Sequence, residues 1–186
     1  MGCSQNAFKI AKVVEAPVGS TGYRCDMSRK RQLPKPGQES VWDYPRPPRV
    51  EPVSAQIRIV LDGELVVEST RAVRVLETSH PPVYYVPRED FARGILAPAE
   101  GSSHCEFKGE ARYLSVGSAT RAAWFYPSPR PGFESLAGRV AVYPSRMDSC
   151  SVDGETVTPQ EGDFYGGWIT TNIVGPFKGA PNTWGW

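Results

Sequence analysis

The 186-residue sequence contains no CxxC pair, only two histidines and no long apolar run. Its four cysteines are scattered, so neither a zinc ribbon nor a disulfide framework is expected. No apolar run approaches the ~20 residues that span a bilayer. The first residues also lack the order of a secretory signal. We therefore expect a cytoplasmic protein with reduced thiols.

Uninterrupted helical stretches are also missing, because 18 Pro and 18 Gly punctuate the chain. Both residues break helix interiors, which excludes a helical bundle or a coiled coil. The hydrophobic fraction of 40% and the charged fraction of 22% are those of a globular protein. At this length we expect one domain with an extension, or two small domains.

Positive charge is concentrated at the start of the chain. The first 50 residues carry a net charge of +5 and the remaining 136 residues carry −4. Residues 1–38 are rich in Gly, Pro and basic side chains, which predicts an irregular basic arm. Such an arm is either solvated or docks on an acidic partner. The negative body argues against nucleic-acid binding.

The opening Met1-Gly2-Cys3-Ser4 bears on membrane attachment. Gly2 is a candidate for myristoylation and Cys3 for palmitoylation, with the basic arm as a further membrane signal. The myristoylation pattern has Ser or Thr at the sixth position, where this chain has Asn6. We therefore expect no membrane contact unless Gly2 or Cys3 is acylated.

The body of the chain has the pattern of short antiparallel strands. Residues 56–61 and 64–70 alternate around Asp62-Gly63, which predicts a hairpin because both turn positions need positive φ. A second hairpin is expected around Asp153-Gly154. Further strands are predicted over 71–77, 83–86, 111–116, 120–126, 139–143 and 168–174, with a short helix within 87–96 and a helical turn at 133–138. This pattern predicts a mainly β fold.

These signals divide the chain into three parts. The arm covers residues 1–38, the β domain covers 39–162, and a C-terminal strand with an aromatic tail covers 163–186. Exposed Trp and Phe would be a liability, so we expect the tail to pack on the domain. Residues 1–50 and 175–186 are the segments expected to contact any protein partner.

Several segments share their motifs, in order, with one family. They read ESVWDYPRPP (39–48), ETSHPPVYYVP (77–87), HCEFKG (104–109), AWFYP (123–127) and YGGWITTNIVGPFKG (165–179). Together they resemble the family known as domain of unknown function 427. The resemblance implies a β-tent type fold, in which two small antiparallel sheets meet at an angle around a pocket, with one or two short helices.

The resemblance does not bring a cofactor with it. Many relatives by fold bind zinc on two CxxC pairs, which are missing here, so no cofactor is predicted. A zinc site from His80, His104, Cys105 and a distant cysteine is an alternative without a spacing signature. Some labels for the family name nucleotidyltransferases, which need paired carboxylates for Mg²⁺. The two Asp-x-Glu spacings, 62–64 and 153–155, lie on hairpin tips and are interpreted as turns.

The candidate catalytic residues lie in the family-like segments. His80 precedes Pro81-Pro82, which stiffens the backbone. Beside Glu77 it is a candidate acid or base near neutral pH. The alternative is a histidine satisfied by one hydrogen bond at a strand end. Cys105 is a candidate nucleophile if a neighbouring cation lowers its pKa, and otherwise a buried structural cysteine.

The candidate ligand-binding residues are basic or aromatic. Arg74 opposes the apolar face of its strand and has the geometry to bind a carboxylate or phosphate. Trp124 and Tyr126 share a strand face and form either core packing or a stacking wall for a planar ligand. The complete predicted set is Arg74, Tyr84, Tyr85, Lys108, Trp124 and Tyr126.

Three functions are compatible with these residues. The preferred one is a small-molecule-binding module with a polar and aromatic pocket. The second is an enzyme that uses His80 and Glu77 for acid–base chemistry, or Cys105 for covalent chemistry. The third is a structural or accessory subunit that uses its arm and tail to join a larger assembly.

Overall fold

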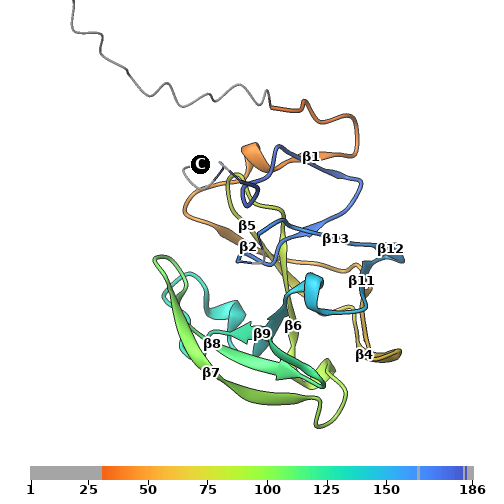
Figure 1. The fold of residues 1–186 in the computed structure, drawn as a ribbon. Helices are drawn as coiled ribbons and strands as arrows, with labels where there is room; N and C mark the ends of the chain where they lie inside the picture. Colours follow the sequence, from red (N-terminus) through yellow and green to blue (C-terminus); the bar gives the residue numbers. More distant parts are fainter. Residues whose placement is uncertain (1–30, 163, 182, 184–186) are drawn as a thin grey trace, which may run out of the picture.

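The computed structural model describes residues 31–162, 164–181 and 183. Over these residues the fold is mainly β, and its helices are short 3-10 turns (Figure 1). None of the helices in this part of the chain is long and apolar enough to cross a membrane. Residues 1–30, with Gly2, Cys3 and most of the basic arm, lie outside the described residues.

The largest sheet has seven strands, and every neighbouring pair is antiparallel. In spatial order the strands are β2 (Arg49–Pro52), β5 (Val73–Leu76), β6 (Val83–Pro87), β10 (Arg139–Val142), β9 (Ala119–Phe125), β8 (Gly109–Val116) and β7 (Leu96–Cys105).

A second antiparallel sheet packs against this one. Its order is β12 (Glu155–Thr156), β11 (Ser149–Val152), β3 (Ile57–Leu61) and β4 (Glu64–Ser69). Both predicted hairpins are confirmed. Asp62 and Gly63 have φ of 54° and 77°, and Asp153 and Gly154 have φ of 49° and 82°. These values belong to the two-residue turns that match the twist of paired strands.

Two short pairs attach the C-terminal segment to the domain. Strand β1 (Glu39–Ser40) runs parallel to β15 (Ile173–Val174), and β13 (Thr158–Pro159) is antiparallel to β14 (Trp168–Ile169). The indole N–H of Trp42 donates to the carbonyl of Pro176 at 2.9 Å. The C-terminal segment therefore lies along the body of the protein, beside the start of the domain (Figure 1).

The core consists of two main clusters. Successive residues of a strand point to opposite faces of the sheet and therefore belong to different clusters. One joins the two larger sheets and includes Ile59, Val86 and Trp168. The other covers the opposite face of the seven-stranded sheet and includes Tyr85 and Trp124. Burying each large apolar side chain contributes about 1.5–3 kcal/mol. Adjacent residues such as Tyr84 and Tyr85 thus belong to different clusters.

The structure adds elements that were not predicted, among them strand β2, and it differs from the predicted elements as follows. The helix expected within 87–96 is only a 3-10 turn over Arg88–Asp90. Strand β7 was not predicted, because Pro98 and Gly101 obscure its alternation. As the edge strand of the sheet it tolerates both residues, with a register shift between Pro98 and Ser102. The strand expected over 168–174 is split into β14 and β15, where Ile173 N–H donates to the carbonyl of Thr170.

Candidate functional site

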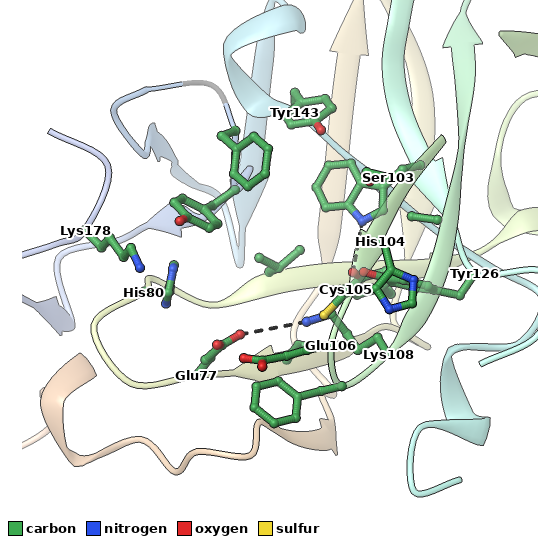
Figure 2. A pocket seen from close by; sticks show the side chains of 18 of the residues that line it. Glu77, His80, Ser103, His104, Cys105, Glu106, Lys108, Tyr126, Tyr143 and Lys178 are labelled. Atoms are coloured by element: carbon green, nitrogen blue, oxygen red, sulfur yellow. Dashed lines mark hydrogen bonds and ion pairs between the residues drawn. The ribbon is translucent and has the colours of Figure 1, made fainter. Parts of the chain in front are cut away.

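A pocket of about 390 Å³ opens beside the seven-stranded sheet, on the face that carries the Tyr85 and Trp124 cluster. It is bounded by the β5–β6 loop, the β7–β8 hairpin and the C-terminal segment. Figure 2 shows His80 and Lys178 facing Cys105 and Lys108 across it. Seven of the predicted site residues line the pocket: Glu77, His80, Tyr85, Cys105, Lys108, Trp124 and Tyr126.

Two predicted ligand-binding residues, Arg74 and Tyr84, lie elsewhere. The guanidinium of Arg74 donates to Glu51 at 2.7 Å and to Glu39 at 3.0 Å, so it is engaged in a structural ion-pair network. Tyr84 follows the alternation of β6 onto the other face, where its ring centroid is 5.1 Å from that of Trp168. The structure therefore does not bring these two residues to the pocket.

His80 is held with one ring nitrogen fixed and the other without a protein partner. Its side chain is buried, and the residue is only 7% exposed. Nδ1 lies 2.9 Å from the carbonyl oxygen of Thr78, and a carbonyl can only accept, so Nδ1 carries the proton. Among the described residues no group hydrogen-bonds to Nε2. Burial lowers the pKa of His80, while Glu77 and the hydrogen bond to Thr78 act in the opposite direction.

The lowered pKa of His80 predicts a pH-dependent stability. Above pH 6.5 the imidazole is neutral in both the folded and the unfolded chain. As the pH falls below 6.5, the unfolded chain binds the proton first, so the free energy of unfolding decreases until the folded-state pKa is reached. The slope is at most about 1.4 kcal/mol per pH unit.

Urea unfolding at pH 7.5 and pH 5.5 measures this effect. His80→Asn should show a smaller decrease than the wild type, because asparagine keeps a donor for Thr78 and does not titrate. The matched control is His104→Asn, at the exposed histidine, which should keep the wild-type decrease. An unchanged decrease in His80→Asn would refute this assignment.

A chain of charges crosses the floor of the pocket. The ammonium of Lys108 is 3.8 Å from one carboxylate oxygen of Glu77. The other oxygen accepts from Arg46 at 2.6 Å. Arg46 also binds Glu106 and lies over the Phe107 ring, 5.0 Å from its centroid. Lys108 is only 8% exposed, so its charge depends on Glu77 as its counter-ion.

Aromatic rings form one wall of the pocket. The indole N–H of Trp124 donates to the hydroxyl of Tyr85 at 3.0 Å, and the Trp124 ring packs 4.5 Å from that of Tyr143. Burial, together with Tyr85 and Cys105, raises the pKa of Tyr126. Burial raises the pKa of Tyr143 to about 12. These hydroxyls therefore stay protonated near neutral pH and are able to donate hydrogen bonds.

Residues of the C-terminal segment, Phe164, Tyr165 and Lys178, form the opposite wall, which the sequence did not predict. The Tyr165 ring meets His80 edge-on, with centroids 4.4 Å apart. Gly166 lets this segment approach, because a Cβ there would sit 2.5 Å from the end of the Trp124 indole. In the sequence, the Gly166-Gly167 pair is the signal for a close approach of the backbone to neighbouring side chains.

Of the two cysteines in the described part of the chain, one lines the pocket and one lies in the core. Cys105 lines the pocket, whereas Cys150 is buried among apolar side chains, where burial raises its pKa to about 12. Over the described part of the chain, no three His, Cys, Asp or Glu side chains are grouped so that they would hold a metal ion. His80, His104 and Cys105 thus do not converge as a set of ligands there.

Three of the four Asp-x-Glu carboxylates accept hydrogen bonds. Asp62 accepts from the hydroxyl of Ser118, and Asp153 accepts from the backbone N–H of Gln56. Glu155 accepts from the backbone N–H and the hydroxyl of Thr171. These side chains stabilise the hairpin tips, in line with their interpretation as turn residues.

The fold and pocket define a small β domain with a ligand-sized cavity of mixed polarity. The family model described as domain of unknown function (DUF427) matches residues 49–153. This chain belongs to that family. A search of the curated proteins found no match. Most of the pocket floor lies in the matched segment, whereas Arg46 and the C-terminal wall lie outside it.

Proposed function

We propose that this protein is a small-molecule-binding module whose ligand occupies the pocket between the aromatic wall and the C-terminal segment. The observation that carries the proposal is the convergence of two buried polar side chains, His80 and Lys108, on one cavity with aromatic walls. Burying such groups is costly unless they find partners, and folded domains retain them where they fix the orientation of a ligand.

The size of the pocket supports a small organic molecule over an ion. A volume of about 390 Å³ is at the lower end of the range for small-molecule sites, and it exceeds by about tenfold the ~30 Å³ that one water molecule occupies. Trp124 and Tyr143 offer flat apolar surface, and Lys108 and His80 offer polar contacts. This combination suits a polar, planar or anionic ligand.

An enzymatic function is the second candidate, and the state of His80 favours it. The imidazole is neutral and its buried Nε2 carries no proton, which is the protonation state of a general base. Glu77 is paired with Arg46 and Lys108, so in this candidate it orients charge near the ligand. Cys105 lines the same pocket and is the candidate for covalent chemistry.

The accessory-subunit alternative depends on the arm and the tail. Near the tail, Lys178 N–H donates to the carbonyl of Ser79, and Gln32 N–H donates to that of Gly175. Both contacts are made within the chain itself, so packing of the tail on its own domain requires no partner protein. A cytoplasmic location and a protein partner for the basic arm stay predictions.

Ligand-observed NMR with a library of planar fragments tests the proposed function. We expect several fragments to bind the wild type and to bind Lys108→Met or Trp124→Leu at least about tenfold more weakly, the equivalent of about 1.4 kcal/mol. The control is Lys35→Met, at an exposed lysine outside the pocket, which should bind like the wild type. Binding that is the same in all four proteins would sink the proposal.

A further inference from the structure

We infer that Arg121 and Arg146 form a binding site for a phosphate group beside the hydroxyls of Tyr113 and Tyr143. The site does not depend on the proposed function, because both arginines are exposed and neither belongs to the lining of the pocket. The inference follows from the backbone of β9, from two stacked Arg–Tyr pairs and from the charges around them.

The backbone of β9 is irregular where it carries Arg121. This residue has φ of 50°, a conformation that is disfavoured for any side chain with a Cβ. The register of β8 and β9 shifts between Leu114 and Val116, and there the N–H of Arg121 donates to the hydroxyl of Ser115 at 3.3 Å. Glycine would adopt this conformation at lower cost. Bulges that redirect a side chain concentrate at functional sites, so Arg121 is a candidate for a binding role.

Both guanidinium groups are held against tyrosine rings. The guanidinium carbon of Arg121 is 4.4 Å from the ring centroid of Tyr113, and that of Arg146 is 5.4 Å from the centroid of Tyr143. Nη1 of Arg146 also donates to the carbonyls of Thr120 at 3.1 Å and Arg121 at 3.4 Å. Side chains that are ordered in this way before a ligand arrives lose less entropy when it binds.

The two tyrosines bring the positive charges to one place. Burial and a hydrogen bond with Tyr113 raise the pKa of Tyr143, whereas the charges of Arg146 and Arg121 act to lower it, so both guanidiniums lie near its hydroxyl. Among the described residues neither arginine forms an ion pair with a carboxylate, and this includes the nearby Glu100. Neighbouring like charges repel, and a bound anion relieves that repulsion.

A phosphate group suits this arrangement. It carries about two negative charges near neutral pH and several strong acceptor oxygens, and the planar guanidinium donates to such oxygens in pairs. Tyr113 and Tyr143 also line the pocket. The phosphate is therefore either a free ion or the phosphoryl group of a molecule that extends into the pocket, and the test separates these two sources.

The test is a titration of the full-length protein with inorganic phosphate at low ionic strength, followed by NMR of backbone amides and arginine side chains. Arg121→Gly removes one guanidinium and relieves the positive φ, so this variant should keep its fold. Arg146→Gln is the second variant. The matched control is Arg58→Gln, which removes the same charge from a half-exposed arginine on β3 in the other sheet.

The wild type should bind phosphate saturably, with shifts that centre on Arg121 and Arg146. Arg121→Gly and Arg146→Gln should each bind at least about tenfold more weakly, and Arg58→Gln should bind like the wild type. No saturable binding by the wild type would overturn the inference, and so would equal binding in all three variants. Either failure leaves the proposed function standing, because its own test uses Lys108 and Trp124.

Phenyl phosphate identifies the source of the phosphate group. An affinity at least about tenfold above that of inorganic phosphate, lost in Trp124→Leu, would support a phosphoryl group on a ligand whose ring lies in the pocket. Equal affinities of the two probes would support a free phosphate ion at the same arginines. Phenyl phosphate that binds equally well to Arg121→Gly and the wild type would contradict the site.

Discussion

Glu77→Gln is expected to lower the free energy of unfolding by about 3 kcal/mol. The substitution leaves the buried ammonium of Lys108 without its counter-ion, 3.8 Å away in the native protein. The amide oxygen of glutamine can keep the hydrogen bond from Arg46. The loss of stability therefore comes mainly from the unpaired charge of Lys108. Urea unfolding at pH 7.5 measures the change.

Lys108→Met is the variant to compare with Glu77→Gln, because it removes the other member of the same ion pair. Removing the lysine leaves Glu77 paired with Arg46, whose side chain is half exposed, so the expected cost is below about 1 kcal/mol. The double variant Glu77→Gln with Lys108→Met should be more stable than Glu77→Gln alone, because no buried charge is left unpaired. Equal losses in the two single variants would contradict the account of the pocket floor.

Gly166→Ala is expected to detach the C-terminal wall from the pocket. The residue has φ of +66°, and its Cβ would meet the Trp124 ring at 2.5 Å and 2.9 Å. Trp124 has little freedom to move, because its indole N–H is bonded to Tyr85. We expect a loss of about 1–3 kcal/mol in addition to the cost of the backbone conformation.

The control for this variant is Gly138→Ala. Gly138 has a similar φ of +70° and open space around its Cβ position, so only the backbone cost of about 1–2 kcal/mol applies. Hydrogen exchange should show the difference locally. The Trp168 amide, which donates to Pro82, should exchange faster in Gly166→Ala than in the control. Similar exchange in both variants would refute a close contact at Trp124.

Local patterns in the sequence predicted much of the fold. The Asp-Gly dipeptides need positive φ at two successive positions, which makes the hairpin turns readable without tertiary information. Strand β7 was missed because Pro98 and Gly101 are tolerated only at a sheet edge, and edge position is a tertiary property. The break between β14 and β15 likewise depends on the turn at Thr170.

The structure brings some of the predicted site residues together at one pocket and leaves others away from it. The family-like segments carry His80 and Lys108, which do line one pocket. Arg74 was expected to be available to a ligand, but Glu39 and Glu51 are brought beside it by pairing that the local pattern does not specify. The wall with Tyr165 depends on the approach of the C-terminal segment, which only the assembled fold determines.

The most direct test of a ligand-binding pocket is native mass spectrometry of the full-length protein purified from its own cells. Lys108→Met prepared in the same way serves as the comparison. We expect the wild type to carry the added mass of a small organic molecule, and the variant to carry it in a much smaller fraction. A bare polypeptide mass for the wild type that persists after incubation with the fragment library would contradict the account. An added mass retained equally by Lys108→Met would also contradict it.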